Sequence, residues 1–335
     1  MIKDAIIKLA NNEDLTTEMA SDVMNDIMSG QVSPVQISSY LTALSMKGET
    51  IEEIVASAKS MRNHATKLLN DQDVLEIVGT GGDKSNSFNI STTSAIVLAS
   101  VGVSVAKHGN RAASSKCGAA DVLEALGVKI DVSPEKSLEM LNKIGICFLF
   151  APLYHPAMKY VAPVRKELAI RTIFNILGPL SNPLGANMQL MGVYDETLVE
   201  PLAEVLTRLG VKSGMVVYGT DNLDEISISA PTKVCEIRNG WYKSYVIDPL
   251  EYGFKKYSKD ELLGGDAKEN AQITKDILNG VKGAKTDAVI LNCAAALYIA
   301  RNDLTLEQAI EEIKKVIDSK KAINKLNEFI EMSNE

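Results

Sequence analysis

The hydrophobic and polar positions of the chain follow two different periods, and the change falls near residue 70. Before it, residues 1 to about 68 carry apolar side chains at helical spacing, as expected of consecutive amphipathic helices. The ends of these helices are marked by capping and stop signals at Ser33 with Pro34, Thr50 with Glu53, Gly30, and Gly48. The sequence therefore predicts a small all-helical N-terminal region.

After Asp71 the pattern changes to short β-rich runs that alternate with helical ones. Alternation of this kind is typical of a mostly parallel central sheet flanked by helices. The expected strands are 73–79, 103–109, 128–132 and 146–152, and the expected helices are 92–102, 119–127 and 137–144.

The rest of the chain continues the α/β pattern and ends in helices. Residues 213–219 read as another buried strand, and Asn239-Gly240 between alternating runs predicts a hairpin, because a type I′ turn needs positive φ at both positions. Thr305 and Gln308 form a capping box in the C-terminal part. We expect a helical domain of residues 1–70 and an α/β domain of residues 71–335.

Composition narrows the class of protein. The 335 residues carry a net charge of -8, which disfavours broad attraction to nucleic acid or to an anionic membrane surface. The four cysteines are scattered without paired spacing, so neither a zinc site nor a disulfide framework is expected. The N-terminus lacks the apolar run of a signal peptide, and the longest apolar stretches are too short or too interrupted to span a bilayer. We expect a soluble cytoplasmic protein.

The first loop with candidate chemistry is GTGGD, residues 79–83, between an expected strand and a helix start. Its glycines let the backbone approach a ligand, and N–H groups there favour a phosphate. The loop matches neither the P-loop nor the dinucleotide-binding fingerprint. Asp83 would repel a phosphate unless it binds sugar hydroxyls or a metal, so a phosphorylated sugar fits both features. The alternative is a tight strand-to-helix turn without a ligand.

The second loop is KHGNRAASS, residues 107–115, again at a strand end and before a helix. Lys107 offers a point charge, Asn110 a donor and an acceptor, and Ser114 and Ser115 hydroxyl groups. Two such loops at successive strand ends follow the rule that ligands bind at the carboxyl ends of sheet strands. The alternative is a solvated basic turn.

Acids and cations in two further segments complete the candidate site. Asp224 and Glu225 follow the strand 213–219; adjacent acids are common on surfaces, but beside phosphate-binding loops they also suit Mg²⁺, with Ser91 as a further oxygen ligand. Farther back, Arg165 offers a bidentate fork to a carboxylate in a proline-containing segment that begins at His155.

Taken together, these stretches resemble the anthranilate phosphoribosyltransferase family of tryptophan biosynthesis. GTGGD, NIST, KHGNRAASS, HPAM with VR, RTIFNILGPLSNP and DE occur in the family's order over residues 75 to 225. The resemblance implies that helices from about residues 163–188 join the N-terminal helices in space, that the cleft between the domains closes over the substrates, and that a homodimer forms through the helical domains. Two positions depart from the family pattern, Cys117 where serine is usual and Ala169 where glycine is common.

The resemblance also implies roles for individual residues. Positions for 5-phosphoribosyl 1-pyrophosphate (PRPP) are Gly79, Gly82, Asp83, Ser87, Asn89, Ile90, Ser91, Thr92, Lys107, His108, Gly109, Asn110, Arg111, Ala112, Ala113, Ser114, Ser115 and Ala119. Positions for anthranilate are Gly79, Asn110, Arg165, His108, His155 and Gly178. Mg²⁺ ligands are Ser91, Asp224 and Glu225, and the catalytic groups are Lys107, Asp224 and Glu225.

The implied reaction joins the amine of anthranilate to C1 of the ribose and expels pyrophosphate. An aromatic amine is a poor nucleophile, so stabilisation of the leaving group is the main catalytic task. One alternative is a pyrimidine nucleoside phosphorylase, which shares the architecture and a glycine-rich phosphate loop. Another is a non-catalytic relative that binds nucleic acid, which the net charge and the intact acid pair disfavour.

Overall fold

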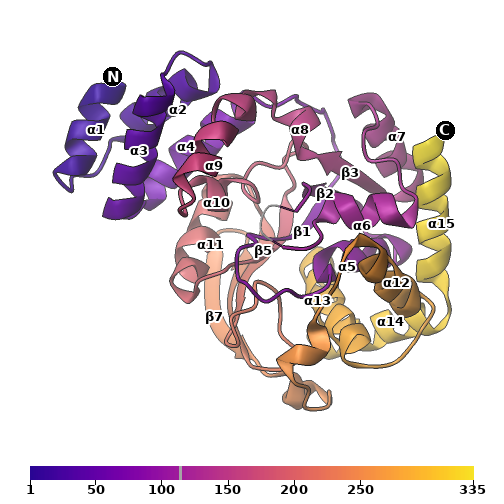
Figure 1. Ribbon diagram of the computed structural model, residues 1–335. Helices are drawn as coiled ribbons and strands as arrows, with labels where there is room; N and C mark the ends of the chain where they lie inside the picture. Colours follow the sequence, from indigo (N-terminus) through magenta and orange to yellow (C-terminus); the bar gives the residue numbers. More distant parts are fainter. Residues whose placement is uncertain (113–114) are drawn as a thin grey trace.

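The computed structural model describes residues 1–112 and 115–335, as a helical bundle beside a sheet that is covered by helices on both faces (Figure 1). Ser33 and Thr50 cap their helices as predicted, each within a capping box. Four helices form the bundle at the N-terminus: α1 Ile2–Ala10, α2 Thr17–Met28, α3 Pro34–Lys47 and α4 Ile51–Asn63.

A seven-stranded sheet in the order β3-β2-β1-β4-β5-β6-β7 forms the centre of the larger part. The first five strands of that order are parallel, and β6 and β7 are antiparallel additions at one edge. The predicted α/β class with a mostly parallel sheet is confirmed. The strands are β1 Leu75–Gly79, β2 Val105–Gly109, β3 Ile146–Phe150, β4 Met188–Gly192, β5 Ser213–Gly219, β6 Thr232–Arg238 and β7 Trp241–Ile247.

The helices of this larger part connect the strands and then close the chain. The predicted capping box at Thr305 and Gln308 is present at the start of α14. The helices are α5 Ile90–Ser100, α6 Ala119–Leu126, α7 Pro134–Ile144, α8 Ala151–Tyr154, α9 Ala162–Leu168, α10 Phe174–Leu177, α11 Val199–Arg208, α12 Ala267–Leu278, α13 Ala284–Ala300, α14 Leu306–Asp318 and α15 Lys321–Asn334. Short 3₁₀ turns are η1 Pro156–Tyr160, η2 Glu196–Leu198, η3 Pro249–Tyr252 and η4 Lys259–Leu262.

One predicted strand is wrong and one strand was missed. Residues 128–132 form an irregular connection between α6 and α7, where the N–H of Lys129 donates to Ser333 of α15. Buried and exposed residues alternate along 128–132 as they would in a strand, but the segment makes no hydrogen-bonded ladder with a neighbouring strand in the described part of the chain. The missed strand is β4, whose sequence MQLMG lacks β-branched residues and carries the buried polar Gln189 at its second position.

The predicted hairpin between β6 and β7 is confirmed. Asn239 and Gly240 have φ of 46° and 86°, as a type I′ turn requires.

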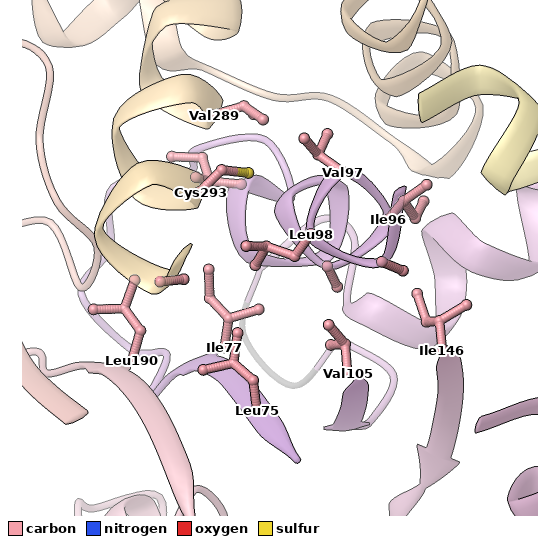
Figure 2. Packing of buried hydrophobic residues seen from close by; sticks show 14 of the residues in the cluster. Leu75, Ile77, Ile96, Val97, Leu98, Val105, Ile146, Leu190, Val289 and Cys293 are labelled. Atoms are coloured by element: carbon pink, nitrogen blue, oxygen red, sulfur yellow. The ribbon is translucent and has the colours of Figure 1, made fainter. Parts of the chain in front are cut away.

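Two hydrophobic cores lie on opposite faces of the sheet. On the first face, α5 and α13 pack against β1, β2 and β4, with Leu75, Ile77 and Val105 below Leu98 and Cys293 (Figure 2). Both helices are buried on nearly all sides, because α14 and α15 cover them in turn. Because α5 and α13 lie between the sheet and these outer helices, their sequences are apolar on almost every side. No helix in the described part of the chain has the length and apolar character needed to cross a membrane.

The second core joins the other face of the sheet to the helical bundle. Helix α11 packs on β5 and β6 and also contacts α4. Farther along the chain, η1, α9 and α10 contact α2, α3 and α4 respectively. The segment that follows β3 therefore runs along the bundle before it returns to the sheet at β4.

Candidate active site

A cavity of about 750 Å³ opens at the carboxyl ends of β1 and β2, beside the segment that follows β5. Its other wall comes from α9, α10 and the residues around η1. Every sequence-predicted site residue that the structure describes lines this one cavity; the predicted Ala113 and Ser114 lie outside the described residues. The lining includes Gly79, Gly82, Asp83, Ser87, Asn89, Ile90, Ser91, Thr92, Lys107, His108, Gly109, Asn110, Arg111, Ala112, Ser115, Ala119, His155, Arg165, Gly178, Asp224 and Glu225.

The glycine loop after β1 is held in place from two sides. Gly81 and Gly82 have φ of 69° and 75°, conformations that L side chains rarely adopt. The Gly81 N–H donates to Asp224 Oδ2 at 2.6 Å, and the Gly82 carbonyl accepts from the Arg171 guanidinium at 2.7 Å. Side chains at these glycines would therefore disturb the backbone that a phosphate would approach.

The acid pair is buried and lies against the loop and α5. Glu225 Oε1 accepts the Ser91 N–H at 3.2 Å, while Asp83 Oδ2 accepts the Asp224 N–H at 3.3 Å. Burial raises the pKa of Glu225 to about 7. Burial, with Asp83 and Glu225 nearby, holds the pKa of Asp224 well above its usual range. The pocket thus makes the ionised carboxylates unfavourable, and a bound cation would stabilise them.

The donor set fits a hard divalent cation. Asp224, Glu225 and Ser91 offer oxygen ligands, and Mg²⁺ typically takes one or two carboxylates together with substrate phosphates and water. Among the described residues, no three His, Cys, Asp or Glu side chains converge on one metal position. A cation here would accordingly need oxygen ligands from its substrate.

Lys107 reaches from β2 towards β1 and α5. Its buried Nζ donates to the Ile77 carbonyl at 2.8 Å and to Ser91 Oγ at 3.3 Å. Burial lowers the pKa of Lys107, and the carboxylates of Glu76 and Glu225 oppose that shift. The ammonium is therefore held beside the acid pair, in reach of the cavity.

Two imidazoles form an uncharged wall of the cavity. The rings of His108 and His155 lie with centroids 5.0 Å apart, and both are buried. Burial lowers the pKa of His108 to about 3 and that of His155 to about 4. Within the described residues both Nε2 atoms lack a hydrogen-bond partner. The wall therefore offers an uncharged surface to an aromatic ring.

Arg165 lies on α9 and lines the same cavity. Its guanidinium is 5.6 Å from the centre of the Phe174 ring. Burial lowers the pKa of Arg165, so the cation is partly desolvated and would bind a carboxylate strongly.

Arg111 has its charge engaged elsewhere. Its guanidinium pairs with Glu124 at 2.9 Å and with Asp121 at 3.1 Å, and Asp121 also accepts the N–H groups of Ala112 and Gly118. In this structure Arg111 therefore stabilises the loop before α6 at the cavity rim.

Several lining residues were missed by the sequence analysis. Many of them stand within stretches already singled out, so their signal was available: Thr80 and Gly81 in GTGGD, Pro156 and Met158 in HPAM, and Phe174, Asn175 and Pro179 in RTIFNILGPLSNP. Others include Met61 and Pro152. Met61 of α4 gave no signal, because an apolar helix position is the same in a core and in a cavity wall.

The comparisons with known proteins agree with this architecture. The description "Glycosyl transferase family, helical bundle domain" matches residues 3–65, and "Glycosyl transferase family, a/b domain" matches residues 71–323. Fold and site are thus those of a two-part glycosyl transferase.

Relatives narrow the family further. The anthranilate phosphoribosyltransferase of Methanobrevibacter smithii is 62% identical over 334 residues, with 100% of both chains covered. The crystal structure of the Thermus thermophilus enzyme is 42% identical with a TM-score of 0.94, covering 99% of this chain and 100% of that one. The Saccharomyces cerevisiae enzyme in complex with PRPP and Mg is 29% identical with a TM-score of 0.91, covering 99% and 98%. The chain belongs to the anthranilate phosphoribosyltransferase family.

Proposed function

We propose that this protein transfers the phosphoribosyl group of PRPP to the amine of anthranilate, giving N-(5-phosphoribosyl)anthranilate and pyrophosphate in tryptophan biosynthesis. The observation that carries the proposal is the convergence of the glycine loop, the Lys107 segment and the acid pair on one cavity. Membership of the family supports the same reaction.

PRPP would lie along the loops at the strand ends. The backbone of residues 79–83 and 89–92 would surround its phosphates, with the loop from Lys107 to Ser115 on the other side. Ser91, Asp224 and Glu225 would hold Mg²⁺. Bound there, Mg²⁺ neutralises charge on the diphosphate leaving group.

The protein's own groups act on the leaving diphosphate. Lys107 is fixed by the Ile77 carbonyl and Ser91 before substrate binds, so its charge needs no reorganisation as negative charge develops. Backbone N–H groups of the glycine loop add to that stabilisation. Walls from α9 and α10 exclude water and hold the amine against C1.

Anthranilate would occupy the side of the cavity formed by the imidazoles and Arg165. Neutral His108 and His155 suit an aromatic ring, and Arg165 would pair with the carboxylate. Gly79, Asn110 and Gly178 line the same space.

The experiment is the disappearance of anthranilate fluorescence on addition of PRPP and Mg²⁺. We expect turnover that stops when Mg²⁺ is chelated. Inorganic phosphate and a nucleoside, the substrates of a nucleoside phosphorylase, should give no turnover. Replacing both Asp224 and Glu225 by alanine should lower turnover far more than it lowers the Tm. Turnover at the wild-type level in that variant, at saturating Mg²⁺, would refute the metal role. The matched control replaces the adjacent surface acids Glu311 and Glu312 on α14.

A second variant tests the anthranilate side. Arg165→Ala should raise the KM for anthranilate by roughly 10- to 150-fold, since a charge-assisted pair contributes about 1.5–3 kcal/mol. The KM for PRPP should stay nearly unchanged. Equal weakening for both substrates would argue against the assignment.

The remaining expectations concern organisation. We propose a helical domain of residues 1–70, extended by helices of about 163–188, beside an α/β domain of residues 71–335. We also propose a cytoplasmic homodimer formed through the helical domain, which the exposed apolar side chains Ile7, Val35 and Met46 on α1 and α3 support. Light scattering of the wild type and of Met46→Glu would test the dimer.

A further inference from the structure

The helix cap at the start of α5 is unusual. Asn89 occupies the N-cap position, where an asparagine side chain normally accepts a hydrogen bond from the second or third amide of the helix. Its side chain makes no such bond. The Ser91 N–H donates to Glu225 instead, and in the described part of the chain the Thr92 N–H has no acceptor. Thr92 lines the cavity, so an unsatisfied donor remains at the proposed phosphate site.

Asn270 of α12 accounts for the missing cap. Its Nδ2 donates to Asn89 Oδ1 at 2.9 Å, and Asn89 Nδ2 donates in turn to the Cys117 carbonyl at 3.2 Å. Asn270 Oδ1 accepts the Gly265 N–H at 2.8 Å. This series of hydrogen bonds begins at a backbone donor, the Gly265 N–H, and ends at a backbone acceptor, the Cys117 carbonyl. The orientation of both side-chain amides is therefore fixed. Asn89 Oδ1 is therefore directed away from the helix it would otherwise cap.

The surrounding packing brings Asn270 to this place. Asn270 is only 2% exposed. The segment before α12 lies against residues 86–88, just before α5, since the Phe88 N–H donates to Leu262 and the Gly264 N–H to Asn86. A Cβ at Gly264 would lie 2.7 Å from both Asn270 Oδ1 and Phe88 Cα. Only glycine permits this approach.

We propose that Asn270 is a positioning residue for the phosphoribosyl donor. By holding the side chain of Asn89, it leaves the Thr92 N–H open for a phosphate oxygen and fixes the end of the loop at Cys117. The role rests on the function proposed above, because it assumes PRPP as the ligand. Asn270 itself does not touch the reacting atoms.

The test uses Asn270→Ala and the near-isosteric Asn270→Leu in the full-length protein. PRPP binding with Mg²⁺, measured by calorimetry without anthranilate, should weaken roughly three- to tenfold, the effect of losing one hydrogen bond. The KM for PRPP should rise by the same factor, while kcat and the KM for anthranilate change less than about twofold. Hydrogen exchange at the Thr92 amide should slow, because Asn89 is released to cap α5.

A control on the same helix separates positioning from folding. Thr274 is as buried as Asn270, and its hydroxyl bonds to that of Thr93 at 2.9 Å, one turn deeper in α5. Thr274→Val should lower the Tm and leave PRPP affinity unchanged. In an Asn89→Ala background, Asn270→Ala should weaken binding no further.

Two results would overturn the proposal. One is wild-type PRPP affinity in both Asn270 variants. The other is full additivity of Asn270→Ala with Asn89→Ala. A wild-type protein that binds PRPP but does not consume anthranilate would instead contradict the proposed function, and the calorimetric comparison would still decide the role of Asn270.

Discussion

Asp224 Oδ2 accepts the main-chain N–H of Gly81 at 2.6 Å, which joins the acid pair after β5 directly to the glycine loop after β1. Asp83, at the end of that loop, accepts the Asp224 N–H in return. The proposed metal ligands and the proposed phosphate loop are therefore joined by hydrogen bonds in both directions. A shift in either segment would move the other.

The tight packing around Asp224 gives the first prediction, for Gly192→Ala at the end of β4. A Cβ there would lie 1.7 Å from the Asp224 carbonyl oxygen, so the backbone of the acid pair must move. We expect a loss of about 1–3 kcal/mol of stability from overpacking. Turnover should fall roughly a hundredfold, as for a displacement of about 1 Å in an active site. Urea unfolding and the fluorescence assay would measure the two effects.

Gly178→Ala provides the contrast. No atom lies within 4 Å of a Cβ at Gly178, and its φ of -54° suits any residue. Its stability should change by less than about 0.5 kcal/mol. The added methyl group would enter the cavity, so the KM for anthranilate should rise. Equal destabilisation by both alanines would contradict the steric argument.

The second prediction concerns Arg171, which links the glycine loop to two other segments. The Arg171 guanidinium lies 4.0 Å from the centre of the Tyr194 ring and donates a hydrogen bond to the Gly82 carbonyl. The main-chain carbonyl of Arg171 accepts a hydrogen bond from the Ser45 hydroxyl of α3. Arg171→Lys keeps the charge but loses the planar contact with Tyr194. We expect the KM for PRPP to rise roughly tenfold in Arg171→Ala and less in Arg171→Lys, with a small change in Tm. Arg208→Ala, on the surface of α11, should change neither KM.

Much of the fold could be predicted because local signals agreed with it. The helix caps at Ser33, Thr50 and Thr305 depend only on residues within one turn of each helix start. The Asn239-Gly240 turn depends only on the positive φ that these two residues readily adopt. The missed strand β4 depends on tertiary context, since its methionines, leucine and glutamine become a strand between β1 and β5.

The candidate site was accessible from the sequence where short motifs carried its chemistry. Glycines and acids at strand ends predicted Gly79, Asp83 and Asp224 together, because parallel strands bring their carboxyl ends to one edge. Asn270 could not be found this way. It stands on a helix far along the chain, and only the packing of that helix against α6 and the start of α5 gives it a role.

Ala169 supplies the third prediction. It ends α9 with φ of 51°, in the left-handed region where glycine costs least. Ala169→Gly should therefore stabilise the protein by roughly 0.5–1 kcal/mol, seen as a higher Tm. The substitution leaves Arg165, one turn earlier, on the same helix, so the KM for anthranilate should be unchanged. A lower Tm would show that the flexibility of glycine in the unfolded chain outweighs the strain relieved.

The fourth prediction concerns Glu76, a fully buried carboxyl group on β1. One oxygen accepts the His108 N–H at 3.3 Å, and within the described residues the other oxygen has no partner. Burial raises the pKa of Glu76 to about 8, against the opposing charges of Lys107 and Arg62. A raised pKa in the folded state means that folding favours the protonated form. The stability from this group is complete below the unfolded pKa of about 4.5 and is lost as the pH rises through 8.

Glu76→Gln should therefore flatten the pH dependence, because the amide stays neutral and still offers an oxygen to His108. A single proton changes the free energy of unfolding by at most about 1.4 kcal/mol per pH unit. Urea unfolding of the metal-free protein at pH 6, 7, 8 and 9 would measure the slope. Asp224 and Glu225 also have raised pKa values and add slopes of the same sign. The difference between wild type and variant isolates Glu76, and equal slopes would show that it folds as a carboxylate compensated by Lys107 and Arg62.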